Sequence, residues 1–144
     1  MTLLIIVIAG FIFMEAANVF ALYFFPDSKL ANSVGVFNAW EKSKADPEIH
    51  NFVNYLVNWV AGTKLIFILL LVVILITADE QILLLTGIAL ILSIAVFFWR
   101  LFPMMRRMDR EDQITPNNYS TVLGWMILVM ILAMTAGVLQ YIFR

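Results

Sequence analysis

Four long apolar stretches, separated by short polar segments, constrain the fold of this chain more than any other feature. They cover residues 2–25, 53–76, 81–101 and 119–143. A helix needs about 20 mostly apolar residues to cross the hydrocarbon core of a bilayer, and each stretch is that long. The first lacks a basic leading segment and is too long for the apolar core of a signal peptide, so we expect it to be a retained span. The sequence therefore predicts four membrane-spanning helices.

Composition supports this prediction and excludes several classes of protein. Of the 144 residues, 63% are hydrophobic and 13% are charged, whereas a soluble domain has roughly half apolar and about a quarter charged residues. The net charge of −1 argues against a nucleic-acid-binding protein, which needs a basic surface. Without cysteine the chain cannot form disulfides or thiolate metal sites. A lipid bilayer is the partner that this composition predicts.

Motifs for catalysis or metal binding are missing from the sequence. His50 is the only histidine, and with Asp46 and Glu48 it would form at best a loose solvated site. There is no phosphate-binding loop, dinucleotide-binding glycine motif or serine–histidine–aspartate arrangement. We therefore predict no catalytic residues, no metal and no resident cofactor, although a bound lipid or quinone is compatible with the sequence.

The distribution of Lys and Arg predicts an orientation. Seven of them lie at the end of the third stretch or in the segments that follow the first and third: Lys29, Lys42, Lys44, Arg100, Arg106, Arg107 and Arg110. The other side carries only Arg144. Because cytoplasmic loops carry an excess of basic residues, both termini should lie outside, and loops 26–52 and 102–118 should be cytoplasmic. The predicted fold is all-α: a membrane-embedded antiparallel four-helix bundle that forms a single domain over residues 1–144.

Helix boundaries can be placed from capping residues. Asp46-Pro47-Glu48 predicts an N-cap and a helix start about two turns before the second apolar stretch. The spacing of Thr77 and Glu80 is typical of a capping box and predicts a tight hairpin before the third helix. Thr115-Pro116 repeats the cap-then-proline pattern before the fourth.

The segment between the first two spans has an amphipathic pattern. Leu30, Val34, Phe37 and Trp40 fall at i, i+4, i+7 and i+10. We therefore predict an interfacial helix over about residues 28–42, with Trp40 as its anchor at the membrane surface. It could be a simple connector or a surface on which a partner docks.

Two charged residues lie deep inside the apolar stretches, where charges are costly and usually face the protein interior. With Thr2 and Thr77 taken as the outer ends of the two helices, Glu15 and Lys64 are each 13 positions from the outer end, or roughly 20 Å at 1.5 Å per residue. Antiparallel neighbours would place them at the same depth. With Asn18 and Asn58 they form the predicted buried polar or ligand-binding cluster. The pair could be a structural ion pair, a proton- or ligand-handling pair, or Lys64 could extend to the headgroups.

Small residues on the last stretch predict contacts between helices. Ala133 and Gly137 form one such face, and a second face contains Gly124 and Thr135. Small residues let helices approach closely in lipid. Because one face is spare in a four-helix unit, we expect a homo-oligomer or a larger membrane complex.

The first stretch and the turn after it carry a family resemblance. The residues concerned are 13–26 (FMEAANVFALYFFP), Leu30-Ala31, 34–36 (VGV), Gly62 and Arg100. In these the chain resembles DoxX-like four-helix membrane proteins. It has Lys64 and Asn58 where such proteins more usually show Arg and Gly. The resemblance implies a four-helix fold whose relatives include quinone-linked oxidoreductase subunits and membrane-protein assembly helpers.

Together these features favour a small non-enzymatic membrane protein that acts as an accessory, assembly or hydrophobic-ligand-binding subunit. A quinone- or lipid-binding subunit of a membrane oxidoreductase is the first alternative. A small proton-coupled transporter is the second, and it is disfavoured because the spans offer few polar residues to line a path.

Overall fold

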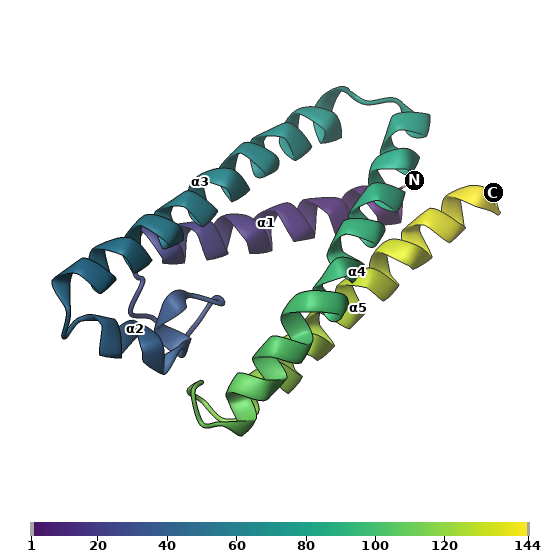
Figure 1. The fold of residues 1–144 in the computed structure, drawn as a ribbon. Coiled ribbons are helices and arrows are strands. Elements are labelled where there is room, and N and C mark those ends of the chain that lie inside the picture. Colours follow the sequence, from purple (N-terminus) through teal and green to yellow (C-terminus); the bar gives the residue numbers. More distant parts are fainter. Residues whose placement is uncertain (1, 144) are drawn as a thin grey trace.

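The computed structural model describes residues 2–143, and its regular elements are all helical (Figure 1). They are α1 (Thr2–Phe24), the 3₁₀-helix η1 (Val34–Val36), α2 (Asn38–Ser43), α3 (Pro47–Thr77), α4 (Glu80–Arg110) and α5 (Tyr119–Ile142). Helices α1, α3, α4 and α5 are each long and apolar enough to cross a membrane. The all-α class and the four predicted helical stretches are thus confirmed.

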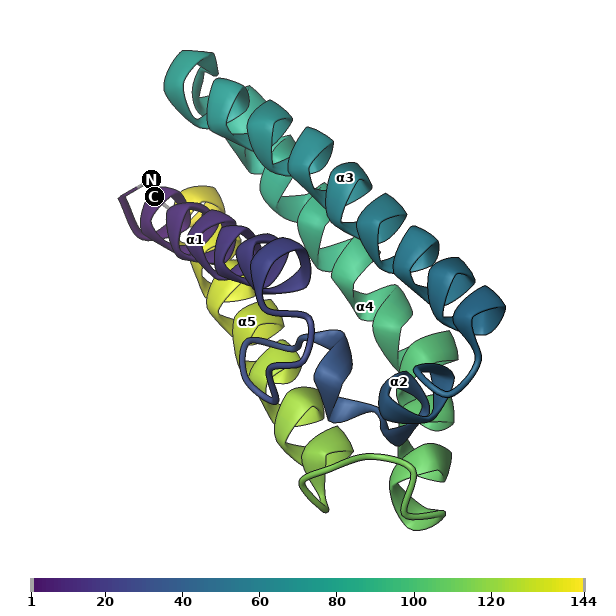
Figure 2. The same ribbon diagram turned by 90° about the vertical axis from the view of Figure 1, so that its left-hand side faces the viewer.

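The long helices alternate in direction along the chain (Figures 1 and 2). The two ends of the described chain lie near each other, at the same end of the molecule as the turn between α3 and α4. We call this the closed end. Helix α2, η1 and the connection between α4 and α5 lie at the opposite end, which we call the split end. Helix α1 packs against α3 and α5, and α4 packs against α5, whereas α3 and α4 touch only sparsely.

At the closed end, one apolar cluster joins all four long helices. Its buried members are Leu4, Ile8, Phe11, Leu71, Leu90, Met134 and Val138. Leu4 is 1% exposed and lies between Gly87 of α4 and Gly137 of α5. A Cβ atom added to Gly137 would lie 2.9 Å from the Cα atom of Leu4, so glycine is required for this approach of α1 and α5.

The position of Gly137 corrects one expectation. Its face of α5 packs against α1 inside the same chain, so that face is not spare. The reason given above for a second chain at Ala133 and Gly137 is therefore wrong, and an oligomer stays a prediction without an assigned surface.

At the split end the apolar core divides into two clusters. One joins α1, α2 and α3 through Val19, Leu22, Trp40, Val57, Ala61 and Ile68. The other joins η1, α4, α5 and their connection through Val36, Met105, Ile114 and Leu123. The four long helices therefore share one core at the closed end and separate into two pairs at the split end.

Several helix boundaries differ from the predicted ones. Asp46 caps α3 as expected, because its carboxylate accepts from the backbone N–H groups of Glu48 and Ile49. The cap of α4 is Asp79, whereas the Thr77 hydroxyl donates to a carbonyl within α3, so no capping box forms. Helix α4 continues past Pro103 to Arg110. The predicted loops 26–52 and 102–118 are correspondingly shorter.

Helix α5 begins after Asn118, later than Thr115-Pro116 predicted. Its first turn is capped from α4, which no local pattern signals. The two carboxylate oxygens of Asp109 accept from the backbone N–H groups of Asn118 and Ser120, and one also accepts from the Ser120 hydroxyl. A carboxylate is favourable at a helix N-terminus because the unpaired N–H groups there carry partial positive charge.

The single amphipathic helix predicted over residues 28–42 does not form. Ala31 and Asn32 have positive φ angles of 52° and 53°, which end any helical run. Gly35 packs so closely on the Asp27 carbonyl that a Cβ atom would overlap it. Helical structure resumes only at η1 and α2.

Trp40 and Leu30 also differ from the prediction. Trp40 is 3% exposed and belongs to the cluster of α1 and α3, so it is a core residue and not a surface anchor. Leu30 points away from that core and is 76% exposed. The physical reason is the turn at Ala31 and Asn32, because it places Leu30 and Trp40 on different parts of the segment.

Candidate functional site

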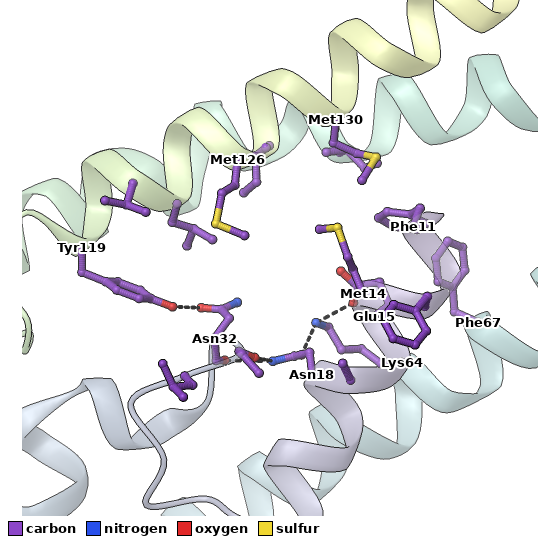
Figure 3. Close-up of a pocket in the computed structure, with 18 of the residues that line it drawn as sticks. Phe11, Met14, Glu15, Asn18, Asn32, Lys64, Phe67, Tyr119, Met126 and Met130 are labelled. Carbon is purple, nitrogen blue, oxygen red and sulfur yellow. Dashed lines mark hydrogen bonds and ion pairs between the residues drawn. The ribbon is translucent and has the colours of Figure 1, made fainter. Parts of the chain in front are cut away.

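A cavity of about 760 Å³ lies where the helix pairs separate. Its walls come from α1, α3 and α5, with one residue of α4, and residues 29–32 close its lower edge (Figure 3). Drug-sized ligands occupy pockets of about 300–1,000 Å³. The cavity is therefore large enough for an organic ligand.

One wall of the cavity holds the predicted ion pair. The Nζ atom of Lys64 lies 2.7 Å from Oε2 of Glu15 and donates at 2.6 Å to Oδ1 of Asn18. The side chains of Lys64 and Glu15 are 30% and 24% exposed. Helices α1 and α3 thus bring the two charges together as predicted, and the Lys64 ammonium is directed at Glu15 and Asn18.

Asn18 connects three parts of the chain at this wall. Its Nδ2 donates to the carbonyl oxygens of Ala31 at 2.7 Å and Asn32 at 2.9 Å, while its Oδ1 accepts from Lys64. The side chain is buried and has no remaining unmet hydrogen bond. Asn18 therefore fixes the left-handed turn at Ala31 and Asn32 to α1 and α3.

Tyr119 and Asn32 line the cavity but were not part of the predicted cluster. The Tyr119 hydroxyl donates at 2.8 Å to Oδ1 of Asn32, which links α5 to the turn across the cavity edge (Figure 3). The two residues are 87 positions apart, and Asn32 sits in a segment predicted to be helical. In the sequence, only the side-chain amide of Asn32 and the tendency of Ala31-Asn32-Ser33 to form a turn could have indicated that Asn32 contacts Tyr119.

Asn58 does not belong to the cluster, which corrects the prediction. It is exposed, and its amide donates to the Asn54 carbonyl one turn earlier in α3. Residues 57, 61, 64 and 68 face α1, whereas position 58 is six residues from Lys64 and so points about 120° away. The observed polar set is Glu15, Asn18, Asn32, Lys64 and Tyr119, with Lys29 at the edge.

The remaining cavity walls are apolar and rich in flexible side chains. Met126 and Met130 of α5 face Met14 and Phe11 of α1 across the space, and Phe67 adds to the α3 wall (Figure 3). Methionine adapts its shape to irregular apolar partners because it is unbranched and polarizable. These walls suit ligands of variable apolar shape.

The cavity opens sideways between α1 and α5. Phe13 of α1 and Val122 and Met126 of α5 line it and are 75%, 57% and 51% exposed. The same two helices touch at Leu4 and Gly137, so the space between them narrows toward the closed end. A ligand can therefore enter from the side without passing through a loop.

Below the cavity, the segment 26–46 is held by its own polar contacts. Asp27 accepts from the Nζ atom of Lys44 at 2.6 Å and from the indole N–H of Trp40. The hydrogen bond from Lys44, and then that from Trp40, lowers the pKa of the Asp27 carboxyl below its ordinary value of 3.8. The bond to Asp27 likewise raises the pKa of Lys44 above 10.5.

The cavity lining is mostly apolar, with a few polar side chains gathered on one wall and along one edge. Within residues 2–143, no group of three or more His, Asp or Glu side chains is placed to hold a metal ion. A mostly apolar space with a few converging polar groups is typical of small-molecule sites.

Comparisons of the chain with protein-family models, curated proteins and solved structures found no match. The resemblance to DoxX-like proteins therefore stays a prediction, and function has to be argued from the cavity itself.

Proposed function

We propose that the chain is an integral membrane protein whose four long helices form an antiparallel unit across the bilayer. Large apolar side chains are exposed along all four of these helices, as a lipid-facing surface requires. Three of the four tryptophans, Trp59, Trp99 and Trp125, are exposed on the halves of their helices nearest the split end. Tryptophan gathers at membrane–water interfaces, so they support a membrane boundary at that level.

The proposed orientation has the split end in the cytoplasm and both termini outside. It rests on the basic residues of segments 26–46 and 100–110, all of which lie toward the split end; Arg144 lies outside the described residues. Because the chain has no cysteine, single cysteines can report it directly. In intact cells, Glu80→Cys should react with an impermeant thiol reagent, while Ala45→Cys and Arg110→Cys should react only after permeabilisation. Labelling of the last two from outside would overturn this orientation.

The cavity supports a role in binding a hydrophobic ligand, as a non-enzymatic accessory or assembly subunit. One observation carries this proposal: a space of about 760 Å³ between membrane-length helices, apolar on most walls and open sideways where lipid would lie. A membrane ligand could enter it without leaving the bilayer. The ion pair on its wall would then orient the polar part of that ligand.

The test is to fill the cavity and measure what the protein retains. Ala17 lines the space, whereas its neighbour Ala16 is also exposed but does not line it. Native mass spectrometry of the detergent-purified protein should show a bound small molecule. This molecule should be absent from the Ala17→Trp variant and still present in the Ala16→Trp variant. Equal retention by both variants, or no bound molecule in the unaltered protein, would contradict the proposal.

The oxidoreductase alternative makes a different prediction for the same experiment. A quinone in the cavity, together with a redox subunit present in equal amounts, would favour it over an accessory role. A proton-coupled transporter has less support, because among residues 2–143 only Glu15 brings a carboxylate to the cavity lining.

A further inference from the structure

We infer that the ligand of this cavity is an amphiphile with one anionic head group and an alkyl chain. This rests on the proposed ligand-binding role and names the chemical class. The head group, a carboxylate or a phosphate, would lie beside Lys29 and Asn32 at the split end. The chain would extend toward Phe11 and Met130.

Polarity changes along the length of the cavity in a way that suits such a molecule. On α5 the lining runs from Tyr119 to Met130, a rise of roughly 16 Å at 1.5 Å per residue. Tyr119 contacts the polar turn, whereas Met130 packs against the closed-end core. On α1 the order is the same, from Asn18 at the polar edge to the buried Phe11. The space is therefore elongated, with a polar end and an apolar end.

Charge at the polar end favours an anion. Two lysines and one glutamate line the cavity, which leaves one positive charge. The Lys64 ammonium is paired with Glu15. Among residues 2–143, Lys29 makes no ion pair or side-chain hydrogen bond, so its charge is available to a ligand.

The amide of Asn32 adds a donor beside this charge. Its Oδ1 accepts from Tyr119, which leaves the Nδ2 group without a hydrogen-bond partner among the described residues. This nitrogen lies on the cavity side of the turn in Figure 3. An ammonium and an amide N–H at one edge suit a carboxylate or phosphate oxygen, because hydrogen bonds to charged acceptors are the stronger ones. A neutral quinone would leave the Lys29 charge unused.

Binding by full-length protein in detergent micelles tests the inference. Palmitate and lysophosphatidate, two anionic single-chain amphiphiles, should each bind at least tenfold more tightly than the neutral monopalmitoylglycerol. Lys29→Gln should weaken binding of both anions about tenfold, the factor expected for one charge-assisted hydrogen bond. Lys42→Gln is the matched control, since Lys42 is exposed in the same segment but does not line the cavity. If only one of the two anions binds, the head group is identified as carboxylate or phosphate.

Two outcomes separate this inference from the broader proposal. If neutral and anionic amphiphiles bind equally, and Ala17→Trp weakens both, the ligand-binding role stands and the anionic class is wrong. If Ala17→Trp changes no binding, the cavity itself is not the site.

Orientation gives an independent check. A palmitate analogue with a photoreactive group at its chain end should crosslink near Phe11 or Met130, and one with the group beside the carboxylate near Lys29 or Tyr119. The reverse pattern would overturn the inference.

Discussion

The same four helices pack together at the closed end of this molecule and separate at its split end. At the closed end Leu4 fills the space between two glycines, and apolar packing from all four helices leaves little room for anything else. At the split end the core separates into two clusters, and polar contacts from Glu15 to Tyr119 hold the edge of a cavity between them.

The difference shows how a small helical protein can combine a tightly packed core with an open cavity. Interhelical association in lipid depends on close approach and on hydrogen bonds between helices. At the closed end, α1 approaches α4 and α5 closely at Gly87 and Gly137, whereas at the cavity edge side-chain hydrogen bonds join α1, α3, α5 and the turn at Ala31 and Asn32. Substitutions at the closed end should therefore change overall stability, whereas those at the split end should change local order and ligand binding.

Gly137→Leu should cause the largest loss of overall stability. Even a Cβ atom at this position would lie 2.9 Å from the Leu4 backbone, so overpacking should lower the free energy of unfolding by about 2–3 kcal/mol. Gly10→Leu is the control, because a Cβ atom there meets nothing within 4 Å. Denaturation in detergent followed by circular dichroism would measure both. Equal stability of the two variants would show that the closed end is not held by close approach.

Asn18→Ala should have the next largest effect, confined to the split end. It removes the donor to Ala31 and Asn32 and the acceptor for Lys64, at a cost of about 2 kcal/mol for partly buried polar groups that lose their partners. Hydrogen exchange should rise in the turn around residue 31 and stay unchanged at the closed end. The exposed Asn58→Ala should leave both unchanged; a uniform rise in exchange for Asn18→Ala would contradict the division into two ends.

The ion pair between Glu15 and Lys64 should contribute less to stability than Asn18 does. Because Glu15 and Lys64 retain about a quarter to a third of their exposure, we expect a coupling energy of about 1–2 kcal/mol, between the values for surface and buried pairs. A double-mutant cycle of Glu15→Gln and Lys64→Met would measure it. Additive losses would show that the two side chains contribute independently.

The smallest expected effect is a dependence of the local stability of segment 26–46 on pH. The folded state lowers the pKa of Asp27 below 3.8, so the carboxylate stabilises the segment above that pH, and the contribution is lost as the pH falls through the lower folded value. The raised pKa of Lys44 keeps that group charged throughout this range. Hydrogen exchange of the segment should rise on acidification, and Asp27→Asn should remove most of that rise. An unchanged acid response in this variant would exclude Asp27 as its source.

Much of the fold could be predicted from the sequence because its signals are local. Apolar runs of sufficient length located α1, α3, α4 and α5, and Asp46 before a proline located the start of α3. The pairing of Glu15 with Lys64 followed from equal depth on two antiparallel helices. Even if the predicted end of either helix had been wrong by two residues, the two long side chains could still have reached each other.

The missed parts depend on contacts between distant residues. The i, i+4, i+7 pattern from Leu30 to Trp40 favoured one helix, but hydrogen bonds from Asn18 stabilise a left-handed turn in its place. The same hydrogen bonds place Asn32 at the edge of the cavity. Asn58 was misplaced because its presence in the same helix as Lys64 does not say which face of α3 meets α1. The cavity itself arises where α1 and α5 diverge, which no single stretch of sequence reveals.

Asp109 has a consequence for the cavity although it lies outside it. By binding the first N–H groups of α5, its carboxylate fixes the turn that carries Tyr119, the residue next to Ser120. If that turn frays, the hydroxyl loses its position beside Asn32, and the cavity loses its crosslink on the α5 side. The position of Tyr119 at the cavity edge thus depends on the last turn of α4, through a carboxylate that does not line the cavity.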